Sequence, residues 1–317
     1  MVPVGCARLK VAIWGQARRS CEIRGGGRFW RSAKSWRCDL ARKTREQDNG
    51  LDHPAEVHGI PVLTWRLLQQ VFTAETIMTP ARELFKAEHD TDLPSRWVEA
   101  RRNHFDLLPV TEGGRIIGIL HEGATEPKSL TDRWLVSRDT GMADLLTLFA
   151  ESGQPGFLVF HRQDVVGLVT PADLNKLPAR VYVYNLIGEM ELALASRVRA
   201  RFSDRADELL QTLGEKRREE LWLQLDELVQ GNVNVDLVEL LHLSDLINAV
   251  AKDRLLRTEL EFPSRRAAET ALGGLNALRN QTMHLVRPLL KQLPEDLATL
   301  QERISRATEL LERMSMI

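Results

Sequence analysis

The stretch Gly167-Leu-Val-Thr-Pro-Ala-Asp-Leu174 decides the first part of the fold, because it marks the point where an apolar strand gives way to a helix. Thr170 is a favourable N-cap residue, and Pro171 suits the first helical position. Asp173 lies in the first turn, where its charge favours the helix dipole. The free backbone amides of such a turn also bind anions. Thr170 and Asp173 are therefore either ligand-binding residues or simple helix caps.

The residues around this stretch repeat one pattern twice between Thr73 and Pro178. Each repeat predicts a helix followed by two apolar strands joined by a polar or Gly-rich turn, which is typical of a β-hairpin. The predicted helices are 93–103 and 142–152, and the predicted strands are 107–110, 115–120, 156–160 and 165–169.

This tandem unit resembles a pair of CBS domains. The resemblance rests on Ile77-Met-Thr79, on Leu108-Pro-Val110 with Gly118-Ile-Leu120, and above all on the stretch from Gly167 to Leu174. It implies a regulatory adenine nucleotide such as AMP, ADP or ATP, with Thr170 contacting a phosphate and Asp173 binding the ribose hydroxyls. The first repeat departs from this pattern, because Gly118-Ile-Leu-His-Glu-Gly-Ala124 lacks a Thr-x-x-Asp sequence. This departure weakens the expectation of a second equivalent nucleotide site.

From residue 181 onward, apolar residues recur at three- and four-residue spacing, which predicts amphipathic helices. We expect helices at 182–200, 203–229, 235–253, 265–289 and 294–314, with Asp236 and Ser264 as caps. The predicted fold class is an α+β tandem CBS pair at 59–180 followed by an all-α helical bundle at 181–317.

A short motif, Leu278-Arg-Asn-Gln-Thr-Met-His284, lies late in the fourth expected helix. On a helix, Asn280 and His284 are four residues apart and share a face, and Arg279 borders that face. Arg279 offers a planar fork to a phosphate, and an imidazole can accept or donate a proton near neutral pH. The three side chains together suit the cleavage of an RNA phosphodiester.

The bundle with this R-N-x-x-x-H motif resembles a HEPN domain. The resemblance implies a homodimer and a metal-independent endoribonuclease that cleaves single-stranded RNA, acting as a toxin or a phage-defence effector. It gives Arg279, Asn280 and His284 as catalytic residues, with no cofactor for catalysis, and Arg287, one turn further on, would help to hold RNA. The CBS pair would then be the ligand sensor.

The alternative is a non-catalytic module in which the CBS pair regulates dimerisation or partner binding by the bundle. In that case Arg279 is a solvated cation and His284 is satisfied in a helix contact. The two hypotheses differ in whether Arg279 and His284 face a polar cleft or pack inside the bundle.

Charge and cysteine content divide the chain further. Residues 1–50 carry 12 Lys/Arg against 4 Asp/Glu, so a basic leader precedes a body of net charge −9. We expect the leader, 1–58, to be disordered, the alternatives being a nucleic-acid-binding arm or a targeting peptide. RNA would therefore have to be attracted by a local cationic cleft on an acidic dimer.

All three cysteines lie in the leader without a C-x-x-C pair, which argues against a zinc site and favours a reducing, cytoplasmic location. No apolar run reaches the roughly 20 residues that span a membrane.

Overall fold

The computed structural model describes residues 63–122, 124, 126–231 and 235–316, so the leader expected at 1–58 lies outside the described residues. Residues 214–240 separate from a larger compact unit. They hold the helix α9 (Glu215–Gln230) and the 3-10 helix η4 (Leu237–Leu240). The larger unit contains both sheets and the remaining helices of the described chain.

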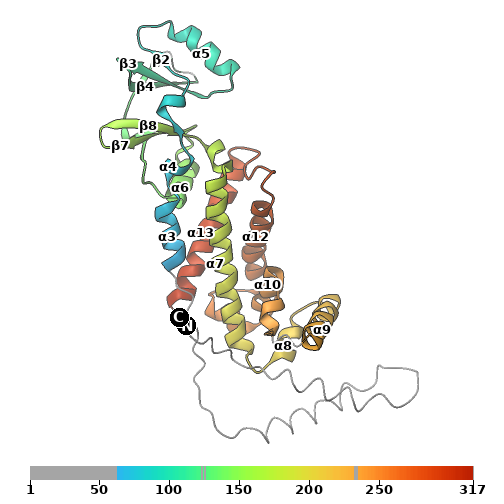
Figure 1. The fold of residues 1–317 in the computed structure, drawn as a ribbon. Helices are drawn as coiled ribbons and strands as arrows, with labels where there is room; N and C mark the ends of the chain where they lie inside the picture. Colours follow the sequence, from blue (N-terminus) through green and yellow to red (C-terminus); the bar gives the residue numbers. More distant parts are fainter. Residues whose placement is uncertain (1–62, 123, 125, 232–234, 317) are drawn as a thin grey trace, which may run out of the picture. The chain divides into compact units, whose positions relative to one another are not determined.

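Two four-stranded sheets repeat one arrangement (Figure 1). In each sheet a parallel pair of strands is followed by an antiparallel hairpin and then by a short antiparallel edge strand. The first sheet has the order β2 (Ala87–Glu88), β3 (Leu107–Glu112), β4 (Arg115–His121) and β5 (Lys128–Ser129). The second has the order β6 (Leu135–Ser137), β7 (Phe157–His161), β8 (Asp164–Val169) and β1 (Thr79–Pro80). The expected internal repeat is therefore confirmed.

Glycines shape both hairpins. Gly113 and Gly114 take φ values of +55° and +79° in the turn between β3 and β4, a conformation that favours glycine. Gly118 on β4 and Gly167 on β8 allow the edge strands to approach closely. A Cβ on Gly118 would lie 2.9 Å from the carbonyl oxygen of Lys128, and one on Gly167 would lie 2.8 Å from that of Thr79. In each repeat, a glycine at the same position thus makes room for the edge strand.

The two repeats share apolar packing. One buried cluster joins the two sheets through Trp134; its other buried members are Leu107, Ile119, Leu158 and Leu168. Each repeat also carries one helix between its parallel strands, α5 (Leu93–Arg102) in the first and α6 (Met142–Ser152) in the second. These two helices match the expected 93–103 and 142–152. The fold class expected from the sequence, an α+β region followed by a largely helical region, is confirmed.

The helical region follows the second sheet directly along the chain. The 3-10 helix η3 (Pro171–Asn175) is followed at once by α7 (Leu177–Phe202), whose residues Leu186, Met190, Leu194 and Val198 are buried at four-residue spacing. Around α7 pack α3 (Leu63–Val71), α10 (Leu243–Lys252), α12 (Arg265–Met283) and α13 (Glu295–Met316), and α13 also packs against α6 (Figure 1). The shorter helices are α4 (Ala74–Ile77), α8 (Ala206–Gln211), α11 (Arg254–Glu259), η1 (Ala81–Glu83) and η2 (Asp132–Trp134). The bundle and the second sheet therefore form one packed body.

Four expected helices have different ends. The helix predicted at 182–200 is α7, which begins five residues earlier, at Leu177, and ends at Phe202. The helix predicted at 203–229 is broken before Gly214 into α8 and α9. The helix predicted at 235–253 begins only at Leu243, and Asp236 instead accepts a hydrogen bond from the amide of Val238 at the start of η4. The helix predicted at 265–289 ends at Met283. It could not have continued undisturbed to 289, because Pro288 lacks an amide hydrogen and disfavours helical geometry in the residue before it. Ser264 caps α12 as expected, since its hydroxyl accepts from the amide of Ala267.

In the part of the chain that the structure describes, no helix has the combination of length and apolar character that a bilayer crossing requires.

Candidate functional site

Thr170 and Asp173 lie together at the end of β8, as the sequence predicts. One carboxylate oxygen of Asp173 accepts from the Thr170 amide at 2.6 Å and from the Thr170 hydroxyl at 2.9 Å. Its other oxygen lies 2.7 Å from the Lys176 ammonium, which also donates to the carbonyl of Ile77 at 2.6 Å. Asp173 is buried, and both of its oxygens are engaged within the chain. The geometry is that of a helix cap that Lys176 ties to the end of α4.

The Arg279 motif lies at the end of α12. Arg279 and Asn280 are in the last turns of the helix, and His284 is its C-cap residue, with ψ at 77°, so the chain leaves the helix directly after His284. Arg279 donates from Nε to Glu191 of α7 at 3.1 Å. Asn280, His284 and Arg287 are exposed. Arg279 therefore neither packs inside the bundle nor stands free for a phosphate.

A buried cation holds the loop that contains His284. Arg180 is 4% exposed and donates to the backbone carbonyls of Asn175, His284 and Arg287. Burial lowers the pKa of the Arg180 guanidinium from its ordinary value, although arginine keeps its charge at any physiological pH. Nearby, Asn175 exchanges two hydrogen bonds with the backbone of Leu290. The loop after α12 is therefore fastened to the end of η3 and the start of α7.

A small polar cavity of about 190 Å³ lies where α12 meets α13. It is lined by Leu278, Gln281, Leu289, Asp296, Thr299, Leu300 and Arg303. None of the expected catalytic residues contributes to it.

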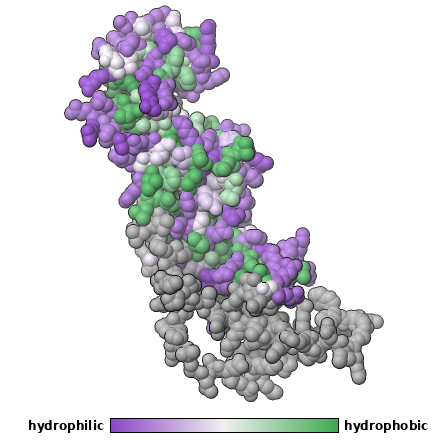
Figure 2. Space-filling view, viewed as in Figure 1, coloured by the Kyte–Doolittle hydropathy of each residue, from purple (hydrophilic) through white to green (hydrophobic). Residues whose placement is uncertain are grey.

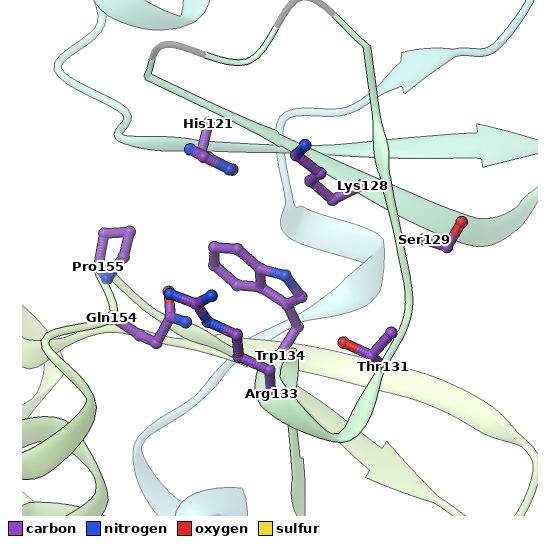
Figure 3. Close-up of a pocket in the computed structure, with 8 residues that line it drawn as sticks. All are labelled: His121, Lys128, Ser129, Thr131, Arg133, Trp134, Gln154 and Pro155. Carbon is purple, nitrogen blue, oxygen red and sulfur yellow. The ribbon is translucent and has the colours of Figure 1, made fainter.

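A larger cavity of about 510 Å³ lies between the two repeats, at the end of β4. Its volume falls in the range of small-molecule sites. The described residues that line it are His121, Lys128, Ser129, Thr131, Arg133, Trp134, Gln154 and Pro155. Figure 3 shows the nitrogen-bearing side chains of His121, Lys128, Arg133 and Gln154 arranged around the indole of Trp134. No Asp or Glu is among these lining residues, so the cavity favours an anion.

One buried polar group of this cavity is unsatisfied. Gln154 is 6% exposed, and its amide nitrogen Nε2 has no hydrogen-bond partner among the described residues. Buried polar groups of this kind are rare, since each one costs about 1–3 kcal/mol. Lys128 and Arg133 are exposed, and neither is ion-paired within the same described part of the chain. Trp134 is buried beside the His121 ring, with the ring centroids 5.2 Å apart. An anion with an aromatic part and a hydrogen-bond acceptor would complement all of these groups.

The sequence interpretation did not single out this cavity. Its residues come from three separate segments, namely the end of β4, the linker around η2, and the loop before β7. The sequence signal for this cavity was the presence of two cations, Lys128 and Arg133, shortly before Trp134 in the linker between the repeats. For metals, no cluster of His, Cys, Asp and Glu suited to an ion is found among the described residues.

Comparisons with known proteins find similarity to solved structures only over part of the chain. No protein-family model matches the chain, and no curated protein matches it. The CBS domain of a bacterial CNNM/CorC family Mg2+ transporter in complex with ATP is 17% identical with a TM-score of 0.29, covering 36% of this chain and 91% of that one. CBSX2 in complex with AMP is 14% identical with a TM-score of 0.31, covering 35% and 98%. A CBS-domain pair with bound AMP from Klebsiella pneumoniae is 20% identical with a TM-score of 0.26, covering 32% and 94%. The similarity thus spans about a third of this chain.

Proposed function

We propose that this chain is a regulatory module whose paired repeats bind an adenine nucleotide in the cavity around Trp134. The observation that carries the proposal is the meeting of three groups at one cavity: the exposed cations Lys128 and Arg133, and the buried amide nitrogen of Gln154, which lacks a hydrogen-bond partner among the described residues. Phosphates would neutralise the cations, and the base would offer an acceptor to Gln154. The resemblance to CBS pairs supports an adenine nucleotide as the ligand.

The helical region would respond to the ligand through its contacts with the second repeat. Asn175 and Arg180 tie the end of the second repeat to the loop after α12, and α6 packs against α13. That loop and its flanks expose apolar side chains: Met283, Leu285, Leu293 and Val286, the last 98% exposed. Figure 2 shows apolar residues among hydrophilic ones on the surface of the helical part. These features support an output by dimerisation or partner binding, provided that the ligand prefers one arrangement of the loop.

The test is calorimetric titration of ATP into the wild type and the Lys128→Ala/Arg133→Ala variant. We expect the variant to bind at least about tenfold more weakly, because two charge-assisted contacts are lost. Arg266→Ala, which removes an exposed cation on α12, is the matched control and should bind like the wild type. Equal affinity of the double variant and the wild type would remove the proposed site.

The predicted nucleotide contact at Thr170 and Asp173 stays a separate proposal. A ribose can reach the Asp173 carboxylate only if Lys176 releases it, because the ammonium lies 2.7 Å from one oxygen. Titration of Asp173→Ala with ATP decides the matter. An affinity equal to that of the wild type would exclude the contact, and a loss of affinity with an unchanged free energy of unfolding would support it.

RNA cleavage by a homodimer through Arg279, Asn280 and His284 is the second candidate, and it is supported by the exposure of Asn280 and His284. The Glu191 ion pair has to open before Arg279 can bind a phosphate. Labelled single-stranded RNA incubated with wild type and His284→Ala tests this function. Cleavage that disappears in the variant would support it, and absent or equal cleavage in both would reject it.

A further inference from the structure

The repeat allows the end of β4 and the end of β8 to be compared residue by residue. Gly118 pairs with Ser129 in the first sheet as Gly167 pairs with Pro80 in the second. Counting onward from each glycine in the sequence, His121 corresponds to Thr170, and Ala124 corresponds to Asp173. Ala124 packs against a buried apolar cluster of the first repeat and does not line the cavity. The first repeat therefore has no counterpart of the Asp173 carboxylate.

This difference changes what the cavity can recognise. Carboxylates are the groups that commonly accept hydrogen bonds from ribose hydroxyls. None of the eight described residues lining the cavity is acidic, and its hydroxyl groups belong to Ser129 and Thr131. The carboxylate of Glu122, next to His121, pairs with Arg101 at 3.7 Å and does not line the cavity. The cavity thus has strong partners for phosphate and a donor for the base, but no carboxylate for the sugar.

We propose that the cavity selects nucleoside polyphosphates by their phosphates and base, and does not discriminate at the ribose 2′-hydroxyl. Lys128 and Arg133 bind the phosphates, the amide nitrogen of Gln154 donates to the base, and Trp134 gives the base an apolar contact. The inference rests on the proposed function, since it assumes that a nucleotide occupies this cavity.

The experiment compares ATP, 2′-deoxy-ATP and AMP by calorimetric titration. We expect ATP and 2′-deoxy-ATP to bind within about twofold of each other, and AMP to bind about tenfold more weakly because it offers fewer charges to the two cations. The Lys128→Ala/Arg133→Ala variant assigns the binding to the cavity, and Arg266→Ala is its control.

The outcomes separate the two proposals. A wild type that binds ATP at least tenfold more tightly than 2′-deoxy-ATP would overturn this inference and leave the nucleotide-binding function standing. Failure of the wild type to bind either nucleotide would overturn the proposed function itself.

Discussion

Arg180 fastens the loop after α12 to the start of α7. Its guanidinium is buried and donates to carbonyl groups of three residues, two of them in the loop after α12. Arg180→Met would fill similar space but leave these carbonyls without a donor. We expect the free energy of unfolding to fall by about 2–4 kcal/mol, measured by urea denaturation. Arg266→Ala should stay within about 0.5 kcal/mol of the wild type, and a similar small change for Arg180→Met would show that the loop does not depend on it.

Single residues also mark the limit of sequence-based prediction. Thr170 and Asp173 were identified because a cap needs a short polar side chain followed by an acid, and that rule is local. The role of Gln154 has no local signature, since an unsatisfied amide is defined by what surrounds it in space. The same is true of Arg279, whose partner Glu191 lies 88 positions away. Local chemistry was predictable, and partners distant in sequence were not.

At the scale of elements, the first turn of α13 holds the preceding loop through a pH-sensitive carboxylate, that of Asp296. The backbone amides of Gln292 and then Lys291 donate to the Asp296 carboxylate and hold its pKa below the ordinary 3.8. A lowered pKa stabilises the folded chain above the ordinary pKa, and this contribution is lost as the pH falls through the folded-state value.

We therefore predict that Asp296→Asn is less stable than the wild type at pH 7 and that the difference shrinks as the pH falls below 4. Thermal unfolding of both proteins between pH 7 and pH 3 measures it. Glu295→Gln, one residue earlier on the same helix, is the control. A difference that stays constant with pH would contradict the role of Asp296.

Helix ends were harder to predict than hairpins for a physical reason. The turn at Gly113 and Gly114 needs positive φ, so the two glycines predict it from the sequence. The helix α12 ends at Met283, and Arg180 binds the carbonyl of His284 just after it, while the apolar spacing runs on through Leu289. The periodicity alone thus predicts six residues too many, because it does not register a partner such as Arg180 that lies far away in the sequence.

At the scale of the whole molecule, we propose that a nucleotide fills the cavity between the repeats. The fold class and the repeat could be predicted from turn residues and apolar patterning. The cavity could not, because it exists only once three segments of the chain meet around Trp134. The packing of α6 against α13 likewise joins regions that the sequence divides at residue 180.

The most direct test is a crystal structure of the protein grown with ATP. The account predicts phosphates beside Lys128 and Arg133, and a base acceptor within about 3 Å of the Gln154 amide nitrogen. A nucleotide bound elsewhere in the chain, with Gln154 still lacking a partner, would contradict it.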